Sequence, residues 1–204
     1  VELLERVKKG AVLYLSIGSA QFRWFDKLSG IDIAYREGSG DFEDILIDDE
    51  KLTVKSEFKY IVESCSSDVI AKADDGRPVL VKNVYGNGVV FVSTIPIEKY
   101  LANQNDVFSN ENSQKFLKWY ECLGKERNNK RIVIPDAQMV CSTEHIIDDS
   151  SRYAVIINYS KKDIKSVLKI DDAWKISEMY RGNLADNNLT IGACDAAVVK
   201  LIKK

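Results

Sequence analysis

The chain has 204 residues, of which 45% are hydrophobic and 29% charged, and its formal net charge is -2 at pH 7. This composition is typical of a globular protein with apolar material for one sizeable core or two small ones. Basic and acidic residues are interspersed, so no cationic field favours nucleic acid or a membrane as a partner. No apolar run approaches the length of a membrane span.

The chain opens with a helix followed by a strand. Helical spacing of apolar residues precedes Gly10, and Ala11–Ile17 then runs apolar like a buried strand. In a parallel sheet, the loop at 16–19 would lie at the carboxyl edge, where open α/β sheets bind ligands. The aromatic segment Gln21–Leu28 predicts a short helix. Because the chain starts at Val1 inside a helical pattern, without Met or a leader, we expect it to be a segment of a longer protein.

The next part of the chain predicts short strands separated by polar turns. They are expected at 31–36, 45–47, 60–63 and 69–73.

The strongest single signal is a β-hairpin within Arg77–Pro96. Val79–Val84 and Val89–Ser93 are rich in β-branched residues, and Gly86-Asn87-Gly88 between them supplies positive-φ positions for a short turn. Beyond it, Ser109–Cys122 has the apolar pattern of a helix that packs against a sheet.

A domain boundary is expected in Gly124–Lys130, which is charged and free of apolar residues. The predicted domains are therefore 1–126 and 127–204. Turn residues divide the second domain into short strands of regular spacing, which predicts an antiparallel β-sandwich. These strands are expected at 131–134, 138–141, 153–159, 164–170, 174–179, 189–191 and 196–202.

The order of ELLERVKKGAVLYLSIG, the hairpin GRPVLVKNVYGNGVVFVSTIP and a closing helix resembles a class I glutamine-amidotransferase-like domain appended to glycoside hydrolases. It is most similar to the trimerisation domain of family 42 β-galactosidases and related clan A enzymes. A small C-terminal β-sandwich follows in that family, and YAVIINYS at 153–160 resembles its strand that ends in Asn. The resemblance implies an α/β plus all-β chain: a flavodoxin-like α/β domain, then a small antiparallel β-sandwich.

The resemblance also implies that the catalytic groups lie elsewhere. In that family two carboxylates act on a (β/α)8 barrel N-terminal to both domains. A barrel of roughly 250 residues does not fit in this chain, so no catalytic residue is assigned.

The cysteines do not support amidotransferase chemistry, which needs a thiol on a glycine-flanked elbow between strand and helix. Cys65, Cys122, Cys141 and Cys194 are widely spaced, lack such neighbours and are expected to be free thiols, which fits a reducing, cytoplasmic compartment. His145, the only histidine, is expected on an exposed turn. The acidic runs lack calcium-loop spacing, and the glycine pairs match no phosphate-binding motif. No metal, cofactor or catalytic site is therefore predicted.

Aromatic residues are the remaining candidates for a site, because sugars stack on flat rings. The set is Phe22, Trp24, Phe25, Trp119, Tyr120, Trp174 and Tyr180. Core packing is the expected role of most of them. We single out Trp24, with Phe25 and Ser19, as candidate sugar or subunit contacts, because they follow the predicted carboxyl edge.

Three functional hypotheses follow. The first is a non-catalytic accessory region of a glycoside hydrolase, serving oligomerisation or active-site capping, with the parent's catalytic barrel and further copies as partners. The alternative is a glycan-binding module that holds carbohydrate directly. A weaker alternative is an independent enzyme on a flavodoxin-like scaffold.

Overall fold

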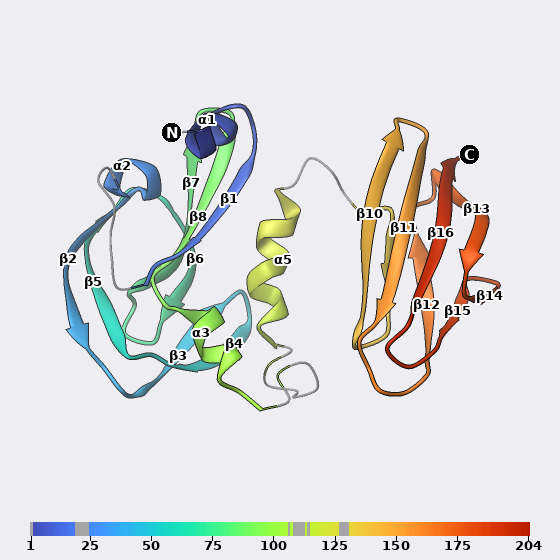
Figure 1. The fold of residues 1–204 in the computed structure, drawn as a ribbon. Helices are drawn as coiled ribbons and strands as arrows, with labels where there is room; N and C mark the ends of the chain where they lie inside the picture. Colours follow the sequence, from blue (N-terminus) through green and yellow to red (C-terminus); the bar gives the residue numbers. More distant parts are fainter. Residues whose placement is uncertain (1, 19–24, 106, 108–112, 114, 127–130) are drawn as a thin grey trace. The chain divides into compact units, whose positions relative to one another are not determined.

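The computed structural model describes residues 2–18, 25–105, 107, 113, 115–126 and 131–204. The chain divides into two compact units, unit 1 (1–128) and unit 2 (129–204). Each unit has its own hydrophobic core, and strands dominate both (Figure 1).

Unit 1 is built on a six-stranded sheet in the order β1-β8-β7-β6-β3-β4. Its strands are β1 (Val12–Ser16), β3 (Phe42–Ile47), β4 (Glu50–Lys55), β6 (Asp68–Ala73), β7 (Pro78–Tyr85) and β8 (Gly88–Ser93). β1 pairs with β8 in parallel, and the other neighbours are antiparallel. The antiparallel pair β2 (Ile31–Gly38) and β5 (Phe58–Cys65) forms a separate ribbon.

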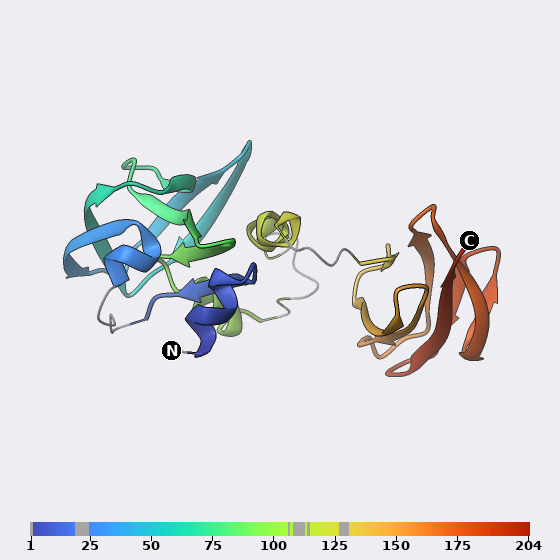
Figure 2. The same ribbon diagram turned by 90° about the horizontal axis from the view of Figure 1, so that it is seen from above.

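Both faces of this sheet are covered near β1 and β8 (Figures 1 and 2). Val12 and Tyr14 join one core, which includes side chains around α3 (Ile97–Ala102) and α5 (Leu117–Lys125). Leu13 joins the other core, with residues of α1 (Glu2–Lys8), α2 (Phe25–Ser29), β2 and β5. Burial on both faces explains why the sequence of β8 is a continuous apolar run.

The predicted strands are present in unit 1, but the sheet is more antiparallel than an open α/β fold. β4 and α3 were not predicted from the sequence. Asp48, Asp49 and Glu50 indicate a turn, and no strand was expected directly after it. The chain does turn at these residues, but it then continues as β4, whose Leu52 and Val54 lie in the core. The β-rich character of the domain thus comes from short strands between polar turns.

The β7–β8 hairpin is docked against the corner between α1 and β1. The backbone N–H of Asn87 donates to the Lys8 carbonyl at 3.0 Å. A Cβ on Gly88 would lie 2.0 Å from the Val7 carbonyl oxygen, so only glycine fits there. In this turn only Gly86 has positive φ, at 66°. Gly88 is therefore required by a close approach of two backbones and not, as the sequence pattern suggests, by its own φ.

Unit 2 is an antiparallel β-sandwich of two four-stranded sheets (Figures 1 and 2). The first sheet contains β10 (Val140–Asp148), β11 (Ser151–Asn158), β16 (Ala196–Lys203) and β13 (Trp174–Arg181), in that order. The second contains β14 (Asn183–Ala185), β15 (Asn188–Ile191), β12 (Ile164–Ile170) and β9 (Val133–Pro135). Residues from both sheets form one core, as the regular strand spacing predicted.

Asn158 closes one end of this sandwich. Its buried side-chain amide donates to the carbonyls of Lys162 and Gly192 at 2.8 and 2.9 Å, and its oxygen accepts from the Ser160 N–H at 2.8 Å. The Asn that ends the YAVIINYS strand therefore joins two loops.

Candidate interaction site

The carboxyl edge of the parallel pair in unit 1 carries a hydrogen-bonded cluster, which we call the Glu98 cluster. It consists of Tyr14 and Ser16 from β1, Glu98 from the first turn of α3, and Trp119 and Tyr120 from α5. Three elements far apart in the sequence thus meet where open α/β sheets commonly bind ligands.

Two phenol groups point their protons at one carboxylate oxygen in this cluster. Tyr14 Oη donates to Glu98 Oε1 at 2.7 Å, and Tyr120 Oη donates to the same atom at 2.9 Å. The indole N–H of the buried Trp119 donates to Tyr14 Oη at 3.1 Å, which fixes the orientation of that hydroxyl. The chain of donors therefore ends on Glu98.

Hydrogen bonds keep Glu98 ionised, and burial keeps the two phenols protonated. Partial burial raises the pKa of Glu98, but hydrogen bonds from Ser16 and Tyr14 outweigh it and hold this pKa below its usual value. Burial, reinforced by the Glu98 charge, raises the pKa of Tyr14 and of Tyr120. Because a carboxylate of lowered pKa is a poor proton donor near pH 7, the cluster suits recognition of a donor group better than acid catalysis.

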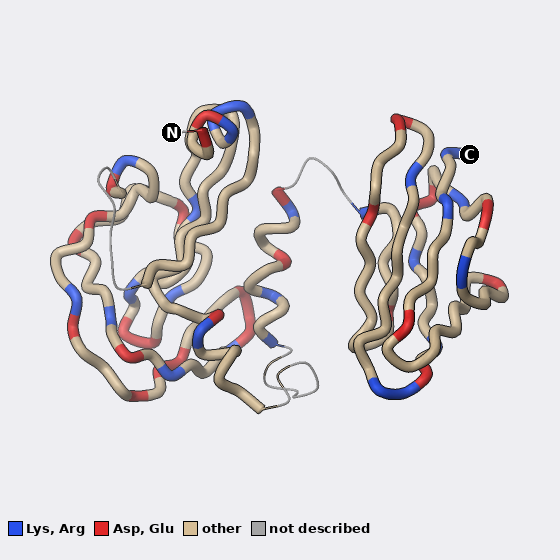
Figure 3. Tube along the Cα trace, viewed as in Figure 1, with Lys and Arg blue, Asp and Glu red and all other residues tan. Residues whose placement is uncertain are grey.

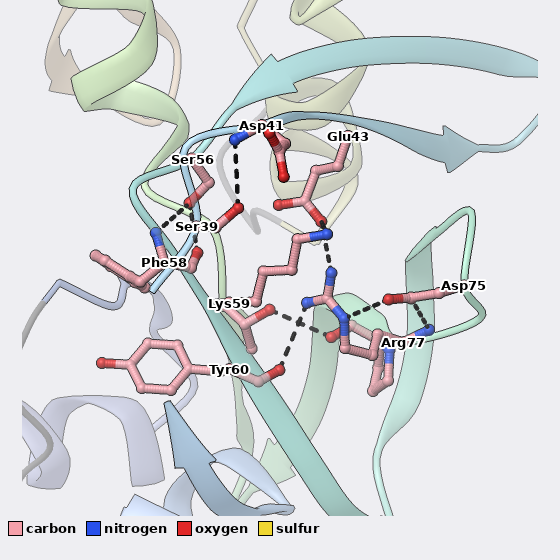
Figure 4. A network of polar contacts seen from close by, with 11 residues as sticks. Ser39, Asp41, Glu43, Ser56, Phe58, Lys59, Tyr60, Asp75 and Arg77 are labelled. Carbon is pink, nitrogen blue, oxygen red and sulfur yellow. Dashed lines mark hydrogen bonds and ion pairs between the residues drawn. The ribbon is translucent and has the colours of Figure 1, made fainter. Parts of the chain in front are cut away.

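A second polar network in unit 1 is buried and centred on Arg77 (Figure 4). Its guanidinium donates to Glu43 and to Asp75, with Arg77 Nε 2.9 Å from Asp75 Oδ2. Lys59 Nζ lies 3.9 Å from Glu43 Oε2, and Arg77 also reaches the Tyr60 carbonyl. The network joins β3, β5 and the β6–β7 turn.

This network has a structural role. The side chain of Glu43 is 1% exposed and that of Arg77 is 10% exposed. Within the described residues Glu43 Oε1 has no hydrogen-bond partner. Burial lowers the pKa of Arg77, but its bonds to Asp75 and Glu43 outweigh this and raise it, so the guanidinium stays charged. Its positive charge balances the buried carboxylate of Glu43.

Of the three contacts singled out from the sequence, Ser19 and Trp24 lie outside the described residues. Phe25 begins α2 and is 5% exposed, in the core beneath α1 and α2. Just before this segment, the carbonyl of Gly18 accepts a hydrogen bond from the hydroxyl of the buried Tyr60.

Of the other aromatic candidates, Phe22 lies outside the described residues, and the rest divide clearly by exposure. Trp119 is fully buried, and Trp174 is 5% exposed, with Arg152 and Lys203 over its ring. Tyr120 is 37% exposed and Tyr180 is 56% exposed. Among the described candidates, these two tyrosines can present a ring to a ligand.

The remaining sequence features form no further site in the described part of the chain. The four cysteines are free thiols. His145 is exposed on β10, and not on a turn. Among the described residues, no three His, Cys, Asp or Glu side chains are grouped to hold a metal ion, and no helix is long and apolar enough to cross a membrane.

Sequence reasoning missed the Glu98 cluster, although two signals were present. Pro96 before an amphipathic hexapeptide marks a helix start. A polar ring at Tyr14 in an otherwise apolar strand also indicates a hydroxyl that needs a partner.

Comparisons with known proteins match the fold but not the sequence. No protein-family model matches the chain, and no curated protein matches it.

Solved structures with this fold include several β-galactosidases. The enzyme from Bacillus circulans sp. alkalophilus aligns with a TM-score of 0.63 at 13% identity, over 97% of this chain and 30% of that one. A GH42 β-galactosidase from G. stearothermophilus gives 0.61 at 13% identity, over 99% and 29%. The cold-adapted enzyme from Rahnella sp. R3 gives 0.65 at 15%, over 97% and 29%.

These alignments span both units of this chain. The chain corresponds to about 30% of the length of the β-galactosidases that it matches. At 13 to 15% identity the similarity concerns the fold alone.

Proposed function

We propose that this chain is a non-catalytic accessory region of a glycoside hydrolase of the family 42 β-galactosidase type. Its partners would be a catalytic barrel in the same parent protein and further copies of that parent. The observation that carries the proposal is the coverage: almost the whole chain aligns with less than a third of each β-galactosidase.

Residues 1–126 would be the flavodoxin-like, amidotransferase-like domain, and 127–204 the C-terminal sandwich. The layering of unit 1 supports this, because helices cover a sheet whose β1 and β8 are parallel. The Glu98 cluster supports a docking role, since it offers an ionised carboxylate and an exposed tyrosine at the carboxyl edge.

An activity assay tests the accessory role. The isolated chain and the full-length parent would be incubated with an aryl β-galactoside; we expect turnover by the parent only. Turnover by residues 1–204 alone would overturn the proposal. The coding sequence upstream of Val1 should also encode a (β/α)8 pattern with two glutamates at strand ends.

An assembly measurement tests the docking surface. Sedimentation of the full-length parent should show an oligomer that Glu98→Arg weakens, because the substitution reverses the charge presented at the carboxyl edge. Glu63→Arg is the matched control, since Glu63 is an exposed glutamate on β5. Equal oligomer stability in both variants would exclude the Glu98 cluster as the interface.

A glycan-binding role is the second candidate. It is favoured by the exposed ring of Tyr180 in unit 2.

A further inference from the structure

The outward face of the β10-β11-β16-β13 sheet carries a row of functional side chains. Alternate residues such as Ala154 and Val199 point into the core. Strand register places His145 opposite Tyr153, Tyr153 opposite Lys200, and Lys200 opposite Glu178. Because directly paired residues share a face, these four side chains form one row across the outward face.

Two β-bulges in β13 shape this row. Ile176 pairs with Leu201 and Glu178 with Lys200, so Ser177 is an extra residue; Met179 pairs with Val199 and Arg181 with Val198, so Tyr180 is a second. Ile176 and Met179 pack against the core. The first bulge therefore directs Glu178 to the outward face, which strict alternation from Ile176 would not do, and Tyr180 follows on the same face two residues later.

The two tyrosines of this face lean toward each other across β16. Neighbouring strands are about 4.8 Å apart, so β11 and β13 are separated by about 10 Å. The ring centroids of Tyr153 and Tyr180 are nevertheless only 5.6 Å apart, in an edge-to-face arrangement with an interplanar angle of 62°. The rings thus form one aromatic corner.

Polar groups line this corner in a continuous chain. Tyr180 Oη donates to Glu178 Oε2 at 2.7 Å, and Lys200 Nζ donates to Glu178 Oε1 at 3.2 Å. These hydrogen bonds, first that of Tyr180, lower the pKa of Glu178 and keep it ionised. The next row contributes the half-buried, paired side chains of Val155 and Val198.

We propose that the outward face around Tyr153, Tyr180, Glu178 and Lys200 is a binding site for a neutral hexose unit of a β-linked oligosaccharide. A sugar ring would stack its C–H face on Tyr180, while its hydroxyl groups exchange hydrogen bonds with Glu178 and Lys200. The row spans three strand spacings, about 14 Å, which is room for more than one sugar unit.

The charge pattern favours an uncharged polyol over other ligands. Glu178 and Lys200 neutralise each other, and the Lys, Arg, Asp and Glu residues of unit 2 are interspersed along the strands (Figure 3). No single-sign field is present that would favour nucleic acid or an anionic membrane. Tyrosines combined with adjacent donors and acceptors match a ligand that alternates C–H and O–H groups.

The use of a galacto-oligosaccharide as a test ligand rests on the proposed function. The binding site itself is inferred from the geometry of unit 2 and does not depend on the proposed function. Binding would be measured on residues 1–204 alone, where no barrel is present. Failure of the accessory role would leave this measurement unchanged, and failure of binding would leave the accessory role unchanged.

The test is a titration of the ¹⁵N-labelled chain with a β-galacto-oligosaccharide and a β-gluco-oligosaccharide, followed by amide chemical shifts. We expect saturable shifts on β11, β13 and β16 near the aromatic corner, with a dissociation constant on the order of millimolar for so small a ligand. Tyr180→Ala should weaken binding at least about tenfold, and Tyr180→Phe, which keeps the ring, should weaken it less.

Tyr159→Ala is the matched control. Tyr159 is 57% exposed, against 56% for Tyr180, and lies just beyond the far end of β11. This variant should bind normally. The proposal is overturned if neither sugar shifts these amides, if the shifts lie elsewhere, or if Tyr180→Ala binds like the parent chain. Shifts at the same amides that depend on protein concentration without sugar would assign the face to a second copy and also overturn it.

Discussion

The two units leave different parts of a sheet available for contact. In unit 1 the sheet is covered on both faces near β1 and β8, and the Glu98 cluster lies at the carboxyl edge of this parallel pair. In unit 2 each sheet buries one face, and the outward face carries Tyr153, Tyr180 and Glu178. A sheet buried on both faces offers a partner its edge, whereas a sandwich offers it a whole face.

The units also differ in the buried group that holds their segments together. Unit 1 encloses an ion pair, Glu43 with Arg77, which couples three segments. Unit 2 also contains an ion pair of low exposure, Arg152 with Glu144, but its loops are joined by the neutral amide of Asn158. Four substitutions test these differences between the units.

The largest effect is expected from Gly88→Ala in unit 1. Its Cβ would lie 2.0 Å from the Val7 carbonyl oxygen and 2.4 Å from that of Ala11, both backbone atoms that cannot move independently. We expect a loss of about 4 kcal/mol in the free energy of unfolding, measured by hydrogen exchange of unit 1 amides. Gly38→Ala, where no atom lies within 4 Å, is the control; similar losses in both variants would contradict the close-approach argument.

Arg77→Leu comes next, because it leaves the carboxylate of Glu43 buried without its main partner. A cost of about 3 kcal/mol is expected in urea unfolding of unit 1. The double variant Glu43→Leu/Arg77→Leu should recover much of that loss, since no buried charge remains. A double variant as unstable as the sum of the single ones would show that the pair is not coupled.

Asn158→Ala should destabilise unit 2 by about 2 kcal/mol, because buried carbonyl groups lose their donor. Trp174 fluorescence follows this transition, since its ring lies in the unit 2 core. Asn188→Ala removes an exposed amide and should change little. Equal effects would contradict the role of the Asn158 hydrogen bonds in holding the two loops.

The smallest effect concerns the pH dependence of unit 1. The pKa of Glu98 is lowered in the folded state, so its contribution is present above the usual glutamate value of 4.5 and is lost as pH falls through the lower folded pKa. Glu98→Gln should remove this part of the acid dependence, at a cost below about 1 kcal/mol at pH 7 because the group is partly solvated. Carboxyl NMR titration of Glu98, with Glu63 followed in the same spectra, gives the direction of the pKa shift of Glu98 directly. A raised pKa of Glu98 would refute the prediction.

The parts of the fold that depend on local sequence patterns could be predicted. β-Branched runs around a glycine turn located β7 and β8, and regular turn spacing predicted the antiparallel sandwich. The sites were harder, because Tyr14 and Glu98 are 84 residues apart and only tertiary folding brings them together. The bulged part of β13 is visible in the sequence pattern. Its core-facing residues Ile176 and Met179 are three positions apart, whereas residues on one face of a regular strand recur every two.

The parallel pairing of β1 with β8 has a consequence for how the chain folds. Val12 faces Val89, so β1 is made early and has no partner strand until the distant hairpin exists. The hairpin itself is local and forms within microseconds, whereas joining remote segments is slow. During synthesis the apolar residues of β1 are therefore made before their partner strand, and we expect the docking of the hairpin onto β1 to be slower than formation of the hairpin itself.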